Sequence, residues 1–140
     1  MKIVIMLAAA VLVAGCAHSG GPEASGGAQT QAAKDKADLA AALRGRTPRA
    51  PQDCVDEPDL DSSRAYGKDV ILFSGRTGEI VYVNRLAAGC PGLDFGRAIR
   101  TQIRTTQLCR GDVVTVFDPV SGTEYGSCAL GVFTPYRRAR

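Results

Sequence analysis

Four cysteines constrain what the second part of this chain can fold into: Cys54, Cys90, Cys109 and Cys128. No two of them are closer than nineteen residues, whereas zinc sites are normally built from close pairs such as C-x2-C. A catalytic thiol needs a basic activator, and the chain's single histidine, His18, is far from all four in sequence. If the domain is exported, an even number of cysteines at these spacings indicates two disulfides and no metal.

The pairing of the cysteines is open, because three connectivities are possible and the sequence does not separate them. We favour Cys54 with Cys128, which would tie the two ends of the domain together, and Cys90 with Cys109, which would close its irregular middle. A domain of under ninety residues with few large aromatic side chains has a small core. Each disulfide, typically contributing about 2–4 kcal/mol, is therefore expected to supply much of the stability.

The N-terminus resembles the signal of a bacterial lipoprotein precursor. Lys2 precedes an apolar run over residues 3–13, and Val13-Ala14-Gly15-Cys16 matches a lipobox. The run is shorter than the ~20 apolar residues that cross a bilayer. An ordinary secretory signal or an uncleaved anchor is the alternative, but Cys16 is the only cysteine in the first fifty residues. The resemblance implies that residues 1–15 are removed and that Cys16 is acylated, which makes the membrane a partner through a lipid anchor.

The residue after the lipobox bears on which membrane would hold the anchor. In lipoproteins of Gram-negative bacteria, an aspartate directly after the lipidated cysteine tends to retain the protein in the inner membrane. Ala17 stands at that position here. By resemblance, the expected location is the outer membrane, facing the periplasm, if the host is Gram-negative.

The charge of the chain argues against a nucleic-acid partner. The sequence has 17 Lys and Arg against 14 Asp and Glu, and removal of residues 1–15 takes away Lys2, leaving 16 minus 14, or +2. Nucleic-acid-binding domains usually carry a strong basic excess. We therefore expect no nucleic-acid partner, and no motif indicates a cofactor.

Composition divides the chain into a removed signal (1–15), a lipidated N-terminus with a flexible tether (16–52), a disulfide-containing β domain (53–136) and a basic tail (137–140). The tether is rich in Gly, Ala, Ser, Gln and Pro and buries too little surface to offset the entropy of ordering. Leu39 and Leu43 are one helical turn apart among good helix formers, so any helix in the tether would be short and marginal alone.

Short β-branched and aromatic runs predict that the domain is mainly β. Runs at 70–73 (VILF) and 80–83 (IVYV), separated by a stretch with two glycines, predict a β-hairpin. Residues 113–117 (VVTVF) predict a further strand, and 124–133 a strand that returns after a turn at 118–122. We expect a small antiparallel sheet or partly closed barrel of five to six short strands, stapled by two disulfides and preceded by a signal helix and a flexible linker.

Residues 95–108 fit the period of a helix and that of a strand. As a helix, they would place Ile99 and Ile103 on one side, with the arginines on an adjacent face. As a strand, they would place both isoleucines on one face and Arg100 and Arg104 on the other face. The threonines of the segment favour the strand.

Several motifs of the domain surround its cysteines. They are Cys54, Tyr82-Val83-Asn84-Arg85-Leu86 with Cys90-Pro91-Gly92-Leu93, Gln107-Leu108-Cys109 with Asp112-Val113-Val114-Thr115-Val116, and residues 127–135. Together they resemble a family of small exported proteins of Gram-negative bacteria that is classified only as a domain of unknown function. The resemblance spans roughly residues 54–135 and implies the domain limits and an extracytoplasmic setting. It implies no activity and no catalytic residue.

An acidic cluster at the start of the domain is the first candidate site. Asp59-x-Asp61-x-Ser63 begins like an EF-hand calcium loop. However, Arg64 stands where the sharp-turn glycine belongs and Val70 where the bidentate glutamate belongs, so the match fails. A looser calcium site is the alternative to a solvated acidic turn, which we favour. The cluster comprises Asp53, Asp56, Glu57, Asp59 and Asp61.

A group of arginines is the second candidate site. Arg97, Arg100 and Arg104 could bind an anionic partner such as peptidoglycan carboxylates or lipid phosphate. A solvated polar face is the plainer interpretation, and the tail at 137–140 is expected to fray. The larger aromatic side chains are expected to pack in the core or at its rim: Tyr82, Phe95, Tyr125 and Tyr136.

The chain contains no Gly-x-Ser-x-Gly, Ser-x-x-Lys or histidine-bearing triad. Acid–base catalysis would need a cleft that joins the carboxylates of residues 56–61 to Asp112 or Glu124. We therefore hypothesise a non-enzymatic, lipid-anchored envelope protein that binds a partner protein or an envelope polymer. The alternatives are a small carboxylate-dependent enzyme acting on envelope material and an anion-binding module that uses its arginines.

Overall fold

The computed structural model describes residues 23–103 and 105–139. These residues form one α-helix, one short 3-10 helix and ten strands. In chain order the elements are α1 (Glu23–Ala42), β1 (Arg46–Pro48), β2 (Cys54–Asp56), the 3-10 helix η1 (Glu57–Asp59), β3 (Leu60–Tyr66), β4 (Val70–Gly75), β5 (Ile80–Arg85), β6 (Ala98–Thr101), β7 (Gln107–Cys109), β8 (Val113–Phe117), β9 (Glu124–Ala129) and β10 (Phe133–Arg138).

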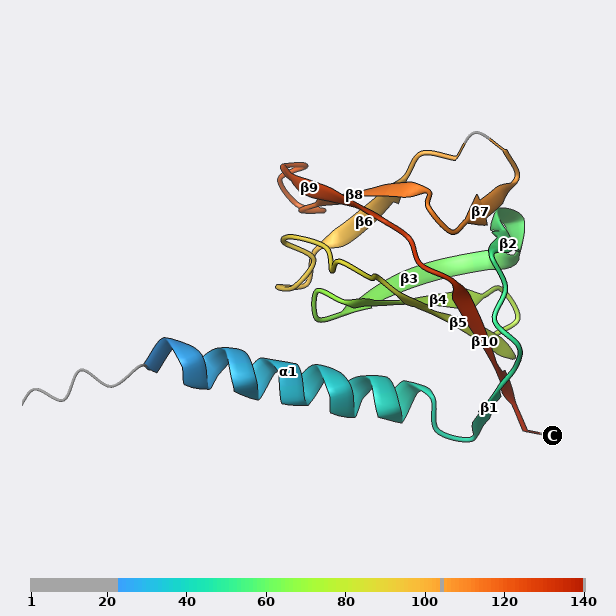
Figure 1. The fold of residues 1–140 in the computed structure, drawn as a ribbon, viewed down its shortest axis with the longest axis horizontal. Helices are drawn as coiled ribbons and strands as arrows, with labels where there is room; N and C mark the ends of the chain where they lie inside the picture. Colours follow the sequence, from blue (N-terminus) through green and yellow to red (C-terminus); the bar gives the residue numbers. More distant parts are fainter. Residues whose placement is uncertain (1–22, 104, 140) are drawn as a thin grey trace, which may run out of the picture.

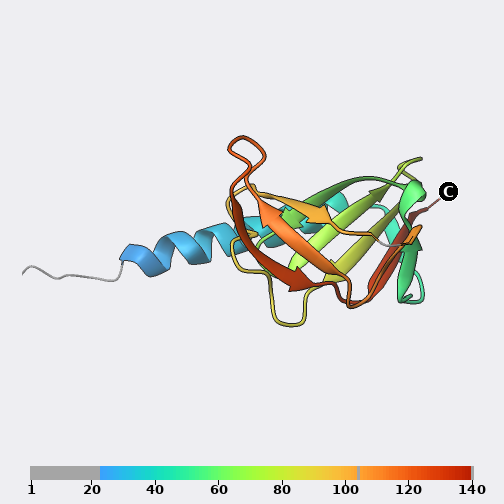
Figure 2. The ribbon, with the colours of Figure 1, turned by 90° about the horizontal axis from the view of Figure 1, so that it is seen from above.

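The strands pair into three antiparallel sheets. The largest has the order β1-β10-β5-β4-β3, a second has the order β6-β8-β9, and β2 pairs with β7. The three-stranded sheet lies over one face of the five-stranded sheet, and α1 runs along the opposite face (Figure 1). Figure 2 shows the three-stranded sheet from above, lying across the strands of the larger one. The mainly β, antiparallel fold is confirmed.

The number of strands is larger than the five to six expected. Several of the additional strands, such as β1, β2 and β7, are only three residues long and show no period of two in the sequence. They are recognised only by their partners in space. The sheets also remain separate and do not close into a barrel.

The predicted hairpin is present as β4 and β5, with Leu72 opposite Val83. Its first strand is buried on both faces. Ile71 and Phe73 belong to the core between the sheets, whereas Val70 and Leu72 belong to a second cluster beneath α1. A strand covered on both sides reads as an unbroken apolar run instead of an alternating one, which accounts for the VILF sequence.

The helix α1 occupies part of the segment expected to be a flexible tether. Leu39, Ala42 and Leu43 pack against the outer cluster of the five-stranded sheet. That apolar surface is formed by strands later in the chain, so the local composition gives no sign of it. The tether prediction is wrong for α1 and for β1, which pairs with β10. Residues 1–22, with the expected signal and Cys16, lie outside the described residues. In the part of the chain that the structure describes, no helix combines the length and apolar character needed to cross a membrane.

The returning strand expected over residues 124–133 is divided between two sheets. β9 pairs with β8, whereas β10 pairs with β5, and the chain crosses between the sheets at residues 130–132. β10 also pairs with β1 and continues to Arg138, past the domain limit expected at residue 136. Arg137 and Arg138 are therefore part of a sheet and not of a frayed tail, while Arg140 lies outside the described residues.

Both expected disulfides form, but the favoured pairing is wrong. Cys54 bonds Cys109 and Cys90 bonds Cys128. The first bond follows from strand register, because β2 and β7 are antiparallel with Cys54 directly opposite Cys109. The second ties the loop after β5 to β9 and so joins the two larger sheets. Register between short strands decides the connectivity, and register is not visible in the cysteine spacing.

Residues 98–101 form the strand β6, as the threonines suggested, with Ile99 opposite Val116 of β8. Arg104, in the same segment, lies outside the described residues. Phe73 and Phe133 meet in the core between the sheets, with their ring centroids 5.6 Å apart. Because β6 pairs only with β8, it is one edge of the three-stranded sheet. It lies close to the open edge of the larger sheet, which β3 forms.

Candidate binding cleft

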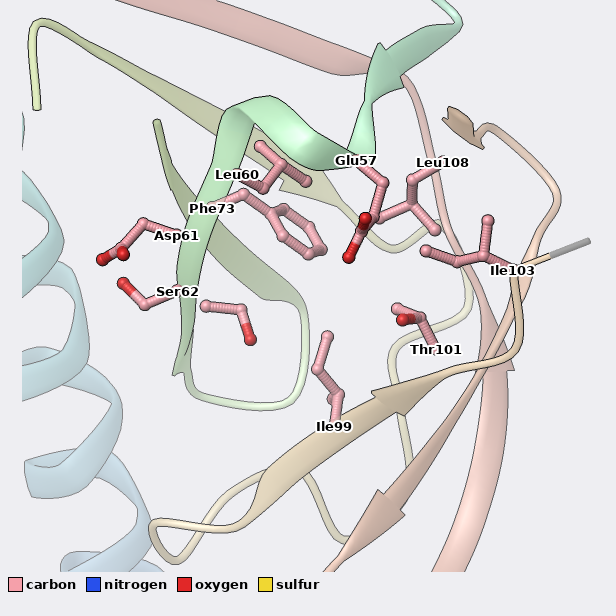
Figure 3. A pocket seen from close by; sticks show the side chains of 10 residues that line it. Glu57, Leu60, Asp61, Ser62, Phe73, Ile99, Thr101, Ile103 and Leu108 are labelled. Carbon is pink, nitrogen blue, oxygen red and sulfur yellow. The ribbon is translucent and has the colours of Figure 1, made fainter. Parts of the chain in front are cut away.

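A cleft of about 150 Å³ opens between β3 and β6 (Figure 3). Each of these strands is hydrogen-bonded to a neighbour on one side only, so each is an edge of its sheet. Edge strands carry unpaired backbone donors and acceptors that can receive a further extended segment. The side chains that line the cleft are Glu57, Leu60, Asp61, Ser62, Ser63, Phe73, Ile99, Thr101, Ile103 and Leu108.

The floor of the cleft is apolar. Phe73 of β4 and Leu108 of β7 are almost completely buried beneath it. Ile99 and Ile103 are partly buried and pack against the same core. A partner group that covers the exposed parts of Ile99 and Ile103 removes apolar surface from water, at roughly 25 cal/mol per Å², whereas Phe73 and Leu108 are already buried and add little.

Glu57 is the polar group best placed to meet a ligand. Figure 3 shows its carboxylate projecting into the space between Phe73 and Thr101, whereas Asp61 points away from that space. Glu57 is exposed, and among the described residues no hydrogen bond or ion pair engages its carboxylate. An apolar floor with a free carboxylate above it suits a ligand that has both an apolar part and a donor or positive charge.

The remaining acidic residues of the predicted cluster are dispersed. Asp56 accepts a hydrogen bond from Gln107 Nε2 at 3.0 Å, and Asp53 lies 3.7 Å from Arg110. Asp59 supplies a backbone carbonyl to the amide of Arg76. Among the described residues, no three His, Cys, Asp or Glu side chains gather closely enough to hold a metal ion.

Asp112 and Glu124, the carboxylates expected to complete a paired catalytic site, do not line the cleft. Asp112 accepts a hydrogen bond from the backbone amide of Cys109 at 2.7 Å and shapes the turn before β8. Glu124, on β9, lies 3.3 Å from Arg100 of β6. Neither residue lines the cleft with Glu57.

The candidate anion-binding arginines make contacts within the domain. The Arg97 guanidinium lies 3.5 Å from the ring centroid of Tyr125 and donates to the carbonyl of Gly92 at 2.9 Å. Arg100 lies over the ring of Phe117 at 4.7 Å, in addition to its ion pair. Both described arginines therefore lie against aromatic rings, and Arg100 is also paired with Glu124.

Tyr82 and Asp118 are among the ionisable groups whose pKa values are displaced by their surroundings. Burial raises the pKa of Tyr82, with smaller contributions from the negative charges of Asp59 and Asp56. The pKa of Asp118 is lowered, because its carboxylate accepts hydrogen bonds from the backbone amides of Ser121 and Val120. Both effects are explained by local structure.

Sequence reasoning misplaced one aromatic residue. Phe95 was expected in the core or at its rim, but it is 83% exposed. The sequence Asp94-Phe95-Gly96 was the available sign of a turn, because Asp and Gly are typical turn residues. In the structure Gly96 has a φ of 71°. Val120, 95% exposed in the loop between β8 and β9, was not singled out at all.

Comparison of the chain with protein-family models, with curated proteins and with solved structures finds no match. The resemblance to small exported proteins therefore stays a prediction, and the geometry of the cleft is the basis on which function is argued.

Proposed function

We propose that this protein is an exported, lipid-anchored binding module whose β3–β6 cleft holds a segment of an envelope protein or polymer. The observation that carries the proposal is the cleft itself, with its apolar floor, its central Glu57 carboxylate and its position between two sheet edges. The ligand is expected to be an extended segment that places one apolar group on the floor and a cationic or hydrogen-bonding group at Glu57.

The size of the cleft supports a segment over a free small molecule. Sites for drug-sized ligands usually measure about 300–1,000 Å³, whereas this cleft is about 150 Å³. Such a space accommodates one side chain or one acyl or sugar substituent of a larger partner. The rest of that partner would run along the flanking strand edges, where backbone groups can pair with it.

The disulfides support the exported setting, because such bonds persist in oxidising compartments and are rare in the cytosol. They also support a pre-organised cleft. Cys54–Cys109 fixes β7, which supplies Leu108 to the floor. Cys90–Cys128 holds the three-stranded sheet, and with it β6, against the rest of the fold.

The two alternative functions receive less support. A carboxylate-dependent enzyme would need a second carboxylate beside Glu57, and Asp61 points away from the space that Glu57 enters. An anion-binding module would need free guanidinium groups, and those of Arg97 and Arg100 lie against aromatic rings. A binding role needs only the surface that the cleft already presents.

The cleft is tested by photo-crosslinking in cells with the full-length protein. A crosslinking amino acid at Thr101, inside the cleft, is compared with one at Thr77, in the exposed β4–β5 turn. We expect a discrete crosslinked product from position 101 only, reduced at least tenfold by Glu57→Arg and unchanged by the matched variant Glu79→Arg. The same products from both positions, or equal effects of both charge reversals, would refute the cleft as the binding site.

The lipid anchor is tested separately by growth with labelled palmitate. Wild-type protein is expected to incorporate label, and the Cys16→Ser variant is expected to lose it together with its recovery in the membrane fraction. An unlabelled wild-type protein in the soluble fraction would contradict the anchor and leave the cleft result standing.

A further inference from the structure

We infer that the end of the domain that carries Phe95 and Val120 rests against the lipid bilayer and inserts both side chains into its interface. The inference rests on the proposed lipid anchor at Cys16 and adds a second, direct contact with the membrane. It concerns a different surface from the β3–β6 cleft, because neither side chain lines that cleft.

Phe95 and Val120 are the most exposed large apolar side chains in the described part of the chain, at 83% and 95%. They lie on two loops at the same end of the domain, the segment before β6 and the loop between β8 and β9 (Figure 1). The guanidinium of Arg97 is 5.5 Å from the ring of Phe95 and 3.5 Å from the ring of Tyr125, next to the β8–β9 loop that holds Val120. A Cβ added at Gly92, in the first loop, would lie 3.0 Å from the Cβ of Tyr125. The two apolar tips are therefore presented at one end of the domain, with Arg97 and Tyr125 between their loops.

The backbone of Phe95 indicates that its side chain is not placed there for local stability. Its φ of 74° makes it the only residue other than glycine with a positive φ in the described part of the chain. Bulky L-residues in this region are strained, and Gly or Asn adopts it at less cost. The loop thus keeps a large, exposed aromatic ring at a position where a smaller residue would fit the backbone better.

The direction of α1 brings this end of the domain toward the proposed anchor. Figures 1 and 2 show α1 running past the two loops, so that its first residue lies beyond them on the same side. The helix is attached to the sheet through Leu39, Ala42 and Leu43 near its other end. Cys16 is seven residues before Glu23, a link of at most about 25 Å. An acyl chain on Cys16 would hold the loop end, and not the β4–β5 turn, near the bilayer.

The chemistry of the surface suits the lipid interface more than an anionic polymer. Five charged residues lie in or beside these loops, two of them positive and three negative: Arg100 is paired with Glu124, Arg97 acts on the charge of Asp118, and Asp94 directly precedes Phe95. Attraction to anionic headgroups is therefore absent, and the contact depends on the two apolar side chains. Tyr125 and Arg97, with apolar bodies and polar ends, are of the kind found at the headgroup level.

Tryptophan reporters test the inference directly, because the chain contains no tryptophan. Phe95→Trp, Val120→Trp and the control Thr77→Trp are prepared as full-length lipidated protein and reconstituted into phosphatidylcholine vesicles with brominated acyl chains. We expect the reporters at 95 and 120 to shift to shorter emission wavelength and to be quenched at least twofold more than the reporter at 77. Replacing a third of the lipid with phosphatidylglycerol is expected to leave this quenching unchanged.

The contact of Phe95 and Val120 with the bilayer and the lipid anchor at Cys16 are contradicted by different results. Vesicle-bound protein with equal quenching at all three positions, or with none, overturns the inference while the anchor stands. Quenching that appears only with anionic lipid also overturns it, because the contact would then be electrostatic. Wild-type protein that is recovered without bound vesicles would instead contradict the lipid anchor. The Cys16→Ser protein, which lacks the acylated cysteine, is the reference for unbound protein.

Discussion

Asn84 and Gly131 exchange two hydrogen bonds across the junction of the two larger sheets. Asn84 Nδ2 donates to the Gly131 carbonyl, and the Gly131 amide donates to Asn84 Oδ1, both at 2.8 Å. Asn84 is fully buried on β5, and an added Cβ at Gly131 would collide with the carbonyl oxygen of Arg85. This pair holds the chain where it leaves β9 and enters β10.

Replacing Asn84 by alanine is expected to destabilise the fold by about 2–4 kcal/mol, because two partly buried backbone groups of Gly131 would lose their partners. Urea unfolding with the disulfides intact measures the change. Gln52→Ala is the control, since Gln52 is exposed and its side chain makes one hydrogen bond, to the carbonyl of Cys54. It should cost less than about 0.5 kcal/mol. Equal losses in the two variants would contradict the role assigned to Asn84.

The disulfide pairing is expected to be Cys54 with Cys109 and Cys90 with Cys128. Non-reducing peptide mapping of protein expressed in an oxidising compartment identifies the linked peptides. A peptide that links Cys54 to Cys128 would contradict the fold, because it would separate β2 from β7.

Removal of either bond, by paired Cys→Ala substitutions, is expected to lower stability by about 4 kcal/mol for loops of 55 and 38 residues.

Phe95→Asn is expected to raise the free energy of unfolding by up to about 1 kcal/mol, because asparagine tolerates the positive φ that strains phenylalanine. The lost side chain is exposed and contributes little packing. Gly96→Ala provides the opposite case in the same loop, where φ is 71°, and should destabilise by about 1–2 kcal/mol. Thermal unfolding of the two variants should therefore move in opposite directions.

Simultaneous replacement of Leu39 and Leu43 by alanine is expected to release α1 while the sheets remain folded, since the two leucines pack on the outer cluster and not in the core between the sheets. Hydrogen–deuterium exchange should show faster exchange over residues 23–42 and unchanged protection in β4 and β5. Ala41→Ser, on an exposed position of the helix, is the control. Loss of protection throughout the sheets would mean that α1 is required for the whole fold.

Tyr82 is expected to make the fold sensitive to alkaline pH. Burial raises the pKa of its phenol in the folded protein, so the folded state favours the neutral form. The stabilisation is complete below the unfolded pKa of about 10 and is lost as the pH rises through the folded value. Tyr82→Phe should therefore lose less stability between pH 8 and pH 11 than the wild type. Identical pH profiles of the urea midpoint would contradict this role.

The part of the site that sequence reasoning found is the acidic cluster, and the part that it missed is the floor beneath Glu57. Leu60, Ile99 and Leu108 come from three strands and meet only because β3 and β6 are facing edges of different sheets. Likewise, Arg97 and Arg100 were recognised as a possible anion site, but the rings of Tyr125 and Phe117, brought in by β9 and β8, decide that they stack instead.

The elements whose signal is local could be predicted from the residues alone: the β4–β5 hairpin with its apolar strands and glycine-containing turn, the strand β8, the mainly β class, and the use of four cysteines in two disulfides. The pairing of the cysteines, the division between β9 and β10, and the packing of α1 on a sheet became visible in the folded chain. These outcomes depend on partners that are distant along the chain, such as Cys109 for Cys54 or Gly131 for Asn84. Register and packing between distant segments are set by the free energy of the whole fold, and no single segment records them.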